Sequence, residues 1–392
     1  MQRSEHRILT THAGSLPRPP GLVDILRASS RWEHVDGEAR AVAVANATRE
    51  AVRQQAAAGI DIANDGEQAR ESFFTYVQHR MEGFGGHWRR VAMQDMVLYP
   101  SFLETMRRAG WNQGVSLGTP PECIGPVAYT EAGRRSFAAE CDAFDRALAT
   151  SAASFESRFM TAPSPGIVAC AMRDTHYRAI EPYVSAVAEA LRYEYEGIAA
   201  RGYVLQIDAP DLAMERHTLF ADRSDADFLA FVDYVIDAVN AASAGVPKER
   251  KRLHVCWGNY EGPHELDIPL RTLLPHLYRA DVGALMISMA NPRHAHEYRL
   301  FREMRLPAGV SLIAGVIDTT TNYVEHPEVV ADRIVLAAEA VGDPHRVLAG
   351  TDCGFDTSAG FGMVAEEVVW AKLRALSVGA AIASERLFGT IG

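Results

Sequence analysis

The sequence predicts an α/β protein folded as a (β/α)8 (TIM) barrel. Eight short apolar runs of strand length recur along the 392 residues, and several of the segments between them have helical periodicity. Apolar strands that alternate with helices indicate a parallel sheet covered on both faces. Eight such units fit one barrel, so we expect residues 1–392 to form a single domain. No G-x-G-x-x-G motif follows the first run, which disfavours a doubly wound sheet, and we interpret "GFGG" (83–86) as an ordinary loop.

The predicted elements follow in chain order. Strands are expected at residues 7–15, 59–67, 166–174, 202–211, 252–259, 284–292, 311–319 and 346–354. Helical periodicity is clear at 181–202 and 326–343. The stretch 75–160 is less regular, and we interpret it as an elaborated insertion with an extra hairpin and a helix at 130–157.

Composition and charge exclude several classes of protein. The net charge is −11 and the isoelectric point is about 5.7, which makes a nucleic acid or an anionic membrane a poor partner. The first residues contain no apolar signal core, and no apolar run reaches the length of a membrane span. Five cysteines argue against a disulfide framework. We therefore expect a cytoplasmic protein with reduced thiols.

Polar residues recur where the predicted strands end. They are Gly14–Ser15, Asp65–Gly66–Glu67, Asp208, His254 with Cys256, Ser288 with Asn291, Asp318, and Asp352–Cys353. The carboxyl ends of barrel strands share one rim, and barrel enzymes carry their chemistry there. Since a barrel needs no polar ring for its stability, this pattern indicates a functional site.

Three of these residues are candidate metal ligands. His254 and Cys256 are two positions apart, so in a strand they point to the same side. Cys353 would reach the same rim. Two cysteines and one histidine with an open fourth position suit a catalytic zinc ion. The alternative is that both cysteines are small buried hydrophobes, which is how we interpret Cys123, Cys141 in a helix and Cys170 in a strand.

Seven motifs occur in an order and spacing that resemble a known family. They are "TTHAGSLPRP" (10–19), "GIDIANDGEQ" (59–68), "LQIDAPDLAM" (205–214), "HVCWGNYEGP" (254–263), "ANPRHAHE" (290–297), "GVIDTTTNYVEHP" (315–327) and "GTDCGFDT" (350–357). The chain resembles the catalytic, C-terminal-type barrel of the cobalamin-independent methionine synthase family, as a short single-barrel core member. The resemblance implies zinc held by His254, Cys256 and Cys353, and transfer of a methyl (alkyl) group to a thiol.

The resemblance also implies residues that hold the thiol substrate. In the family homocysteine is bound at positions that match Gly14, Ser15, Glu67 and Asp208. Carboxylates could grip the substrate ammonium group, and a serine with its backbone N–H could receive the carboxylate. The alternative for the two acidic residues is capping of the following helix. Trp257 and Asn259 are expected in the pocket wall, or in ordinary packing at the barrel top.

The sequence departs from the family pattern in three ways. It has one barrel where the full-length enzymes have two, so we expect a non-folate donor such as a methylcorrinoid or a corrinoid protein. Ser288 stands where the family has a glutamate close to the zinc, and its hydroxyl or water would take that place. The histidine that serves as an acid in the larger enzymes is absent.

Other groups are candidates for the role of the missing acid. Asp318 is the candidate catalytic group in the matching segment, and Asp352 could orient a ligand. His294 and His296, expected in one helix, and His326, expected at the start of another, are weaker candidates for a proton donor.

Four interpretations of function stay open. The leading one is methylation of homocysteine or a related small thiol. The second is an epoxide-opening transfer to coenzyme M, as in the related epoxyalkane:coenzyme M transferases, whose sulfonate would need Arg18, Arg173 or Arg293. A zinc-storing or partner-binding barrel would need a fourth protein ligand. A zinc hydrolase would need a carboxylate base where Ser288 stands. A homo-oligomer is also left open.

Overall fold

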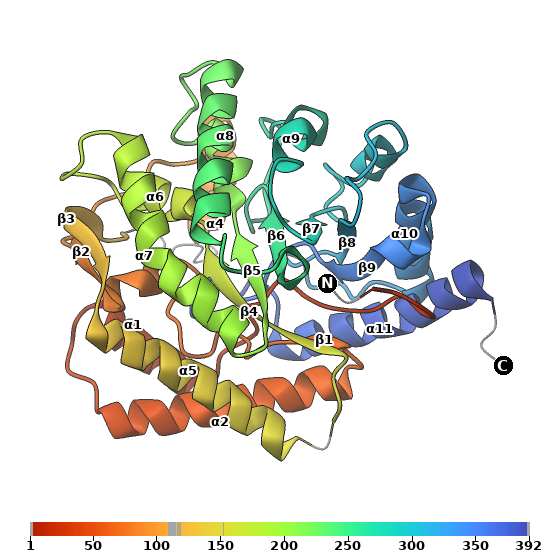
Figure 1. Ribbon diagram of the computed structural model, residues 1–392, viewed down its shortest axis with the longest axis horizontal. Coiled ribbons are helices and arrows are strands. Elements are labelled where there is room, and N and C mark those ends of the chain that lie inside the picture. The colour runs from red at the N-terminus through yellow and green to blue at the C-terminus, as the bar shows by residue number, and fades with distance from the viewer. Residues whose placement is uncertain (1–2, 109–114, 116–118, 152, 390–392) are drawn as a thin grey trace.

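The computed structural model describes residues 3–108, 115, 119–151 and 153–389. Its main feature is a curled sheet of parallel strands surrounded by helices (Figure 1). The parts of the chain that lie within these ranges contain no helix that is long and apolar enough to cross a membrane.

Seven parallel strands form the sheet in the order β1-β4-β5-β6-β7-β8-β9. Their bounds are β1 Ile62–Ala63, β4 Ser157–Pro163, β5 Val204–Asp208, β6 Lys251–Val255, β7 Ala284–Ile287, β8 Ser311–Ile317 and β9 Val347–Thr351. The five strands β5 to β9 consist entirely of buried residues. Burial on both faces agrees with the near-continuous apolar runs of the sequence.

The first predicted strand closes the barrel without being a regular strand. Thr10 forms a parallel bridge to Ala349 of β9. Ala349 donates its N–H to Leu9 O, and Thr11 donates to Ala349 O, both at 2.9 Å. On the other side, the N–H of Ile62 in β1 donates to Thr10 O at 3.0 Å. This segment therefore fills the eighth position of the ring, and the predicted barrel is confirmed.

Helices cover the outside of the sheet. The longer ones are α1 Pro20–Ser30, α2 Gly37–Ala57, α5 Glu131–Thr150, α7 Ile180–Ala200, α8 Asp225–Ala242, α9 Leu270–Leu277, α10 Pro327–Val341 and α11 Glu366–Phe388. Short 3-10 turns lie at η1 Thr75–His79, η2 Pro210–Leu212, η3 Met214–His217, η4 Lys248–Arg250, η5 Glu297–Arg302 and η6 Pro344–Arg346. Neighbouring helices pack pairwise, for example α7 on α8 and α10 on α11.

One predicted strand is wrong. Of the predicted strand 166–174, residues 166–171 lie in helix α6 (Pro165–Ala171), and the barrel strand is β4, which lies just before it. The Ser164 hydroxyl accepts a hydrogen bond from Ile167 N at 3.0 Å, and Pro165 occupies the first helical position. Both are helix-start signals, and periodicity cannot separate a short buried helix from a strand. Cys170 consequently lies in a helix, although it is buried as expected.

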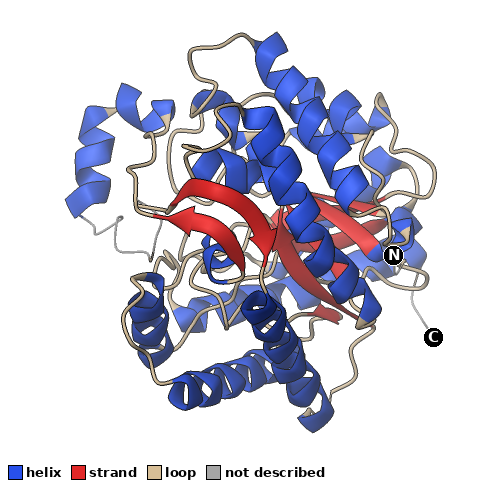
Figure 2. Ribbon diagram, turned by 60° about the vertical axis from the view of Figure 1, so that its left-hand side comes forward, coloured by secondary structure: helices blue, strands red, loops and turns tan. Residues whose placement is uncertain are grey.

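The insertion contains the expected hairpin and helix. Strands β2 (Met81–Gly85) and β3 (Glu122–Tyr129) pair antiparallel beside the barrel (Figure 2), and α5 follows. Residues 83–85 thus lie in a strand, where a loop was expected. Two short helices, α3 (Gln94–Leu98) and α4 (Pro100–Arg108), lie between the hairpin strands in sequence. Parts of the predicted insertion, residues 109–114, 116–118 and 152, lie outside the described residues.

Two expectations about histidines have different outcomes. His326 caps the start of α10 as predicted, and its Nδ1 accepts from Glu328 N at 3.2 Å. His294 and His296 were expected in a helix, but they lie in a turn before η5. Pro292 and the Asn291 side chain, which accepts from Arg293 N, favour the turn at this position.

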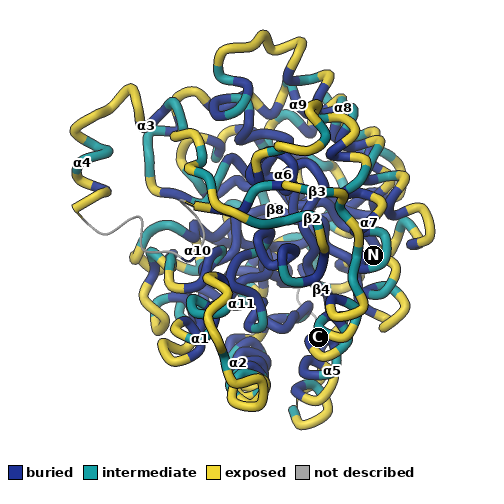
Figure 3. The backbone as a smooth tube through the Cα atoms, turned by 90° about the vertical axis from the view of Figure 1, so that its left-hand side faces the viewer, coloured by how far each residue is buried: buried dark blue, intermediate teal, exposed yellow. Residues whose placement is uncertain are grey.

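The interior of the molecule contains both apolar and polar side chains. The tube in Figure 3 shows buried chain at the centre and exposed chain on the outer helices and on α4. Inside the barrel, apolar side chains such as Phe159 and Met286 form one cluster. Arg252 is also buried, stacks over Phe159 and donates to Gln206 Oε1 at 2.7 Å. This buried guanidinium is therefore hydrogen-bonded, as burial requires.

Candidate metal and substrate site

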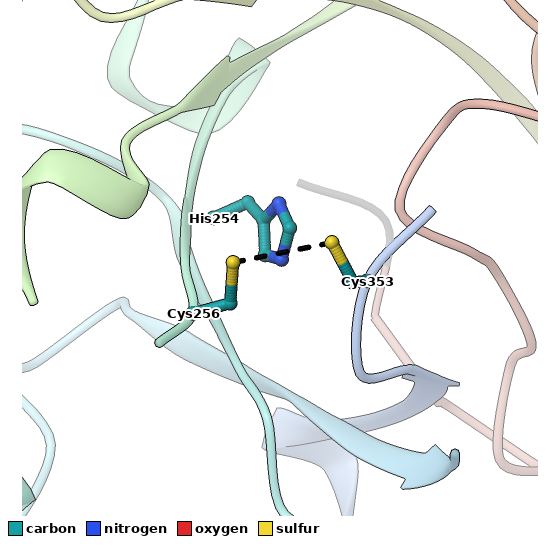
Figure 4. A group of neighbouring side chains, drawn as sticks. All are labelled: His254, Cys256 and Cys353. Atoms are coloured by element: carbon teal, nitrogen blue, oxygen red, sulfur yellow. Dashed lines mark hydrogen bonds between the residues drawn. The ribbon is translucent and has the colours of Figure 1, made fainter. Parts of the chain in front are cut away.

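Three predicted ligands converge at the carboxyl-end rim of the barrel. His254 is the second-to-last residue of β6, Cys256 follows that strand, and Cys353 lies just after β9. Figure 4 shows the three side chains pointing toward one another. Their ligand atoms lie within 4.8 Å of one another, and all three residues are buried. The barrel thus brings together residues that are 97 positions apart in the chain.

The donor set fits a zinc ion. The two Sγ atoms are 3.9 Å apart, whereas a disulfide bond is about 2.05 Å long. Two thiolates at about 2.3 Å from a tetrahedral zinc ion lie about 3.8 Å apart. The observed separation is therefore compatible with a shared zinc ion. All five cysteines are free, in agreement with the expected lack of disulfides.

The thiols differ in their tendency to ionise. The hydrogen bond from Cys353, together with the nearby His254 imidazole, holds the pKa of Cys256 well below its usual value. The same contact and burial raise the pKa of Cys353. These opposite shifts favour ionisation of Cys256 over Cys353, and thiolate is the form that binds zinc.

Asp208 orients the His254 imidazole, and Asp352 fixes the backbone of residues 289–291. His254 Nδ1 donates to Asp208 Oδ1 at 2.9 Å, which leaves Nε2 directed toward the rim, 3.2 Å from Asp352 O. Against burial, the hydrogen bond to Asp208 and the Cys256 sulfur raise the pKa of His254 to about 10. The Asp352 carboxylate accepts three backbone N–H bonds from Met289, Ala290 and Asn291, at 2.7–2.9 Å. Asp208 therefore acts on the imidazole, in the manner of residues that orient metal-binding histidines.

A cavity of about 300 Å³ opens beside the three ligands. His254, Cys256 and Cys353 line it together with Ser15, Glu67 and Asp208. Most of the remaining wall is apolar or aromatic: Phe73, Phe74, Met93, Met96, Leu103, Met214, Tyr260 and Phe361. An apolar cavity with a few convergent polar groups is the usual form of a small-molecule site.

Glu67 is the most unusual carboxylate of the cavity. It is buried, its φ angle is +56°, and its Oε2 atom has no hydrogen-bond partner among the described residues. Its Oε1 accepts from Thr161 Oγ1 at 2.9 Å. Burial raises its pKa to about 8, although Arg70 acts in the opposite direction. A strained, buried and half-satisfied carboxylate is typical of a ligand-binding position.

Gly14 provides room for Glu67. Its φ angle is +130°, and a Cβ atom at this position would lie 2.6 Å from Glu67 Oε1. The neighbouring Ser15 packs closely against Gly354, beside Cys353. The structure thus places the predicted substrate residues Gly14, Ser15 and Glu67 around one end of the cavity.

Ser288 and Asp318 line a second, small pocket together with Cys353 and Asp352. Ser288 Oγ donates to Asp352 O at 2.7 Å. Asp318 Oδ1 accepts from the N–H and hydroxyl groups of Thr320 and Thr321 at 2.8–3.0 Å. Asp318 therefore holds its own loop together.

Trp257 and Asn259 are both fixed by hydrogen bonds. Trp257 Nε1 donates to Ile268 O at 2.8 Å, and its ring lines the small pocket. Asn259 lines both pockets, since Nδ2 donates to Gly354 O and Oδ1 accepts from Thr319 Oγ1. The expected wall position thus applies to Asn259 in the main cavity and to Trp257 in the small pocket.

Sequence reasoning missed two contributions to the site. Thr161, which holds Glu67, lies on β4, and the misplaced strand concealed it; the run "SRFMTAP" (157–163) was the available signal. The insertion also supplies Arg89, Arg90 and α3 side chains to the cavity. No local motif distinguishes these residues from an ordinary loop.

Comparison with known proteins places this geometry in a family context. Residues 95–369 match the family described as "Cobalamin-independent synthase, Catalytic domain". A methionine synthase of Sulfolobus acidocaldarius is 25% identical over 348 residues, which cover 88% of this chain and 85% of that protein. The 2-hydroxypropyl-CoM lyase of Xanthobacter autotrophicus is 28% identical over 47% of this chain and 52% of its own length.

A solved structure supports the barrel. The B12-independent methionine synthase of Shewanella sp. W3-18-1, in complex with selenomethionine, superposes with a TM-score of 0.74 at 22% identity. The superposition covers 98% of this chain and 100% of that one. At this identity the likeness establishes the fold, whereas the family match spans most of the chain. This protein belongs to the cobalamin-independent synthase family and carries its catalytic domain.

Proposed function

We propose that this protein transfers a methyl (alkyl) group to the sulfur of a small thiol, homocysteine first among them, with Zn²⁺ as cofactor. The observation that carries the proposal is the convergence of His254, Cys256 and Cys353 within 4.8 Å in one cavity wall with Glu67 and Asp208. The family match and the methionine synthases among the relatives support it.

The roles of the residues follow from their positions. Zn²⁺ on one imidazole and two thiolates would supply a Lewis acid that ionises a substrate thiol at neutral pH. Asp208 accepts from His254 Nδ1, so that Nε2 is the nitrogen that a zinc ion would take. Glu67 offers its unpartnered Oε2 to a substrate ammonium, which would stabilise the charged carboxylate against burial. Ser15 would receive the substrate carboxylate.

We assign supporting roles to the groups of the small pocket. Ser288 stands beside Cys353, where its hydroxyl keeps the Asp352 carbonyl in place. Asp318 fixes residues 318–321 at the edge of the same pocket. These contacts support positioning roles for both residues.

For the donor we propose a methylcorrinoid, free or carried by a corrinoid protein. The apolar part of the cavity wall, which includes Phe73, Met93 and Phe361, supports an uncharged reacting group. Assay with methylcobalamin as the donor and homocysteine as the acceptor tests this part of the proposal. Methionine formed from a folate donor but not from methylcobalamin would overturn it.

The match to the 2-hydroxypropyl-CoM lyase favours a second candidate, addition of an epoxide to coenzyme M. The cations expected for its sulfonate are engaged elsewhere. Arg18 is paired with Asp356 at 3.0 Å, Arg173 with Glu122, and Arg293 donates to Glu265 O. Two arginines that sequence reasoning did not select, Arg89 and Arg90, do line the cavity, and Arg90 is paired with Glu215.

Metal content and thiol-induced proton release test the proposal together. We expect wild-type protein to contain zinc bound at the three ligands, and we expect Cys353→Ser to lose this zinc. We expect proton release on addition of homocysteine to the wild type only. A matched control is Cys141→Ser, which removes a buried thiol that contacts Met160 far from the rim. Proton release with coenzyme M alone would favour the second candidate, and a metal-replete protein without zinc at these ligands would contradict both.

A further inference from the structure

A second set of side chains of metal-ligand type lies at the small pocket that Cys353 also lines. It consists of His264 and Asp267 in the loop after β6 and His294 in the turn after β7, whose ligand atoms lie within 4.8 Å of one another, and of His217 at the end of η3, which joins them through Asp267. We call these four residues the histidine cluster. All four are buried, and they come from three separate segments of the chain. No role in the proposed reaction uses them.

The inner nitrogens of the histidine cluster face one carboxylate. His264 Nδ1 lies 2.8 Å and His294 Nε2 lies 2.7 Å from Asp267 Oδ2. His217 Nε2 lies 3.2 Å from the other oxygen, Oδ1. Three imidazoles thus converge on a single acidic group.

The outer nitrogens of two of these imidazoles are held by acceptors. His264 Nε2 donates to Tyr260 O at 3.0 Å, and His294 Nδ1 donates to Glu297 Oε2 at 2.8 Å. Metal-binding histidines are oriented in this way, by a backbone carbonyl or a carboxylate on the second nitrogen. Both imidazoles therefore face acceptor atoms on both sides. Two positive charges must lie between them and Asp267, either as two extra protons or as one divalent cation.

His217 supplies a further nitrogen beside Asp267. It is 2% exposed, its Nδ1 atom has no hydrogen-bond partner among the described residues, and its Nε2 atom lies 3.2 Å from Asp267 Oδ1. A cation bound beside Asp267 would take His217 Nε2 as a ligand.

We propose that the histidine cluster is a second, closed metal site that binds zinc or a similar divalent transition-metal ion through His217, His264, His294 and Asp267. Four protein ligands with no open position are typical of a structural site. The site would fix the loop that begins at Cys256, because Trp257 stacks on His294 with ring centroids 3.7 Å apart. It would thereby stiffen the segment that carries one ligand of the catalytic centre.

The test uses the Cys256→Ser/Cys353→Ser double variant, whose catalytic ligands are removed while the histidine cluster is intact. Protein is loaded with Zn²⁺ alone, desalted and measured for metal content and zinc X-ray absorption. We expect the double variant to keep one zinc per chain, with only nitrogen and oxygen ligands at about 2.0–2.2 Å. Adding His264→Ala should remove this zinc. The matched control, His276→Ala, removes a half-buried histidine paired with Asp233 on the outer helices and should not.

Wild-type protein gives a measurement that does not depend on how the variants fold. Crystals of the zinc-loaded wild type should show two anomalous peaks at the zinc edge, one of them enclosed by His217, His264 and His294. A zinc-free double variant, or no peak at the histidine cluster, would overturn the proposal and establish a pair of buried imidazolium ions instead. Zinc in the double variant but no sulfur-bound zinc in the wild type would support this site and contradict the proposed catalytic centre.

Discussion

At the residue scale, the candidate site depends on carboxylates that act on other side chains. Asp208 orients His254, and Asp352 gathers three backbone N–H groups beside Cys353. Glu67 differs, because one of its buried oxygens has no hydrogen-bond partner within the described part of the chain. These three environments assign different tasks to residues of the same type: positioning a ligand, fixing a loop and binding a substrate.

Replacing Asp208 by Asn should weaken zinc binding by about 10- to 100-fold. The amide retains the size of the side chain but loses the charge that fixes the His254 Nδ1–H. Competition with a chromophoric chelator measures the affinity. The matched control is Asp233→Asn, which alters another carboxylate–imidazole pair, at 2.7 Å from His276 on the outer helices. Equal affinities for wild type and Asp208→Asn would refute the positioning role.

Glu67 should make the protein less stable as the pH rises. The folded carboxyl has a pKa of about 8, against an ordinary value of 4.5. Its stabilising contribution is therefore complete below pH 4.5 and is lost as the pH rises through about 8, by at most about 1.4 kcal/mol per pH unit. Glu67→Gln carries no such ionisation and should lack this decline.

Urea unfolding of wild type and Glu67→Gln from about pH 5 to about pH 8 checks this prediction. As the pH rises, the free energy of unfolding of the wild type should fall steadily relative to that of Glu67→Gln. Glu33→Gln, at an exposed position, serves as the control and should follow the wild type. Parallel curves for wild type and Glu67→Gln would show that Glu67 is already charged in the folded protein.

At the scale of elements, the insertion is joined to the metal-binding loop. Asp95 of α3 is buried, accepts from Leu266 N at 2.9 Å and accepts from the Tyr260 hydroxyl at 3.2 Å. Tyr260 in turn stacks on His264 of the histidine cluster. The helix that supplies Met96 to the cavity wall is thus tied to the loop after β6.

Asp95→Ala should therefore loosen both segments at once. The change leaves the Leu266 N–H without its acceptor, which costs about 1–3 kcal/mol. Hydrogen exchange should accelerate in α3 and in residues 260–266, with little change in the barrel strands. Glu104→Ala on α4 removes only exposed pairs with Arg107 and Arg108 and is the control. Exchange confined to α3 would indicate that the two segments are independent.

At the scale of the whole molecule, the barrel is closed by a short and irregular seam. Thr10 is the bridging residue, and Asp61 fixes it by accepting from its N–H at 2.8 Å and its hydroxyl at 3.0 Å. Arg7 pairs with the same carboxylate at 2.7 Å. β1 itself has two residues, so side chains supply part of the closure that strand pairing gives elsewhere.

Asp61→Ala should lower the stability of the entire barrel by about 1–3 kcal/mol, because two buried donors of Thr10 lose their acceptor. Urea unfolding monitored by tryptophan fluorescence and by circular dichroism should shift together. Asp24→Ala, in a surface pair with Arg27, should change stability by less than about 0.5 kcal/mol. A loss that appears in only one of the two signals would place the effect in a local segment.

Much of the fold and the site was predictable from sequence. The apolar runs at β5 to β9 are long enough and sufficiently buried on both faces to identify strands directly. The polar residues after them had to share one rim, because parallel strands point the same way. The errors at residues 166–174 and 83–85 fall where short apolar or glycine-rich runs suit more than one local structure. The turn at residues 294–296, expected as a helix, is a further error.

The sequence alone was enough to place most of the strands and helices and to identify the chemistry of the rim residues, including His254, Cys256 and Cys353. Which polar groups meet became visible in the folded chain. There Asp208 contacts His254, Glu67 Oε2 has no partner among the described residues, and His217, His264 and His294 all face Asp267. The physical reason is that periodicity records which side of an element is buried, whereas partners from distant segments are chosen by packing in three dimensions.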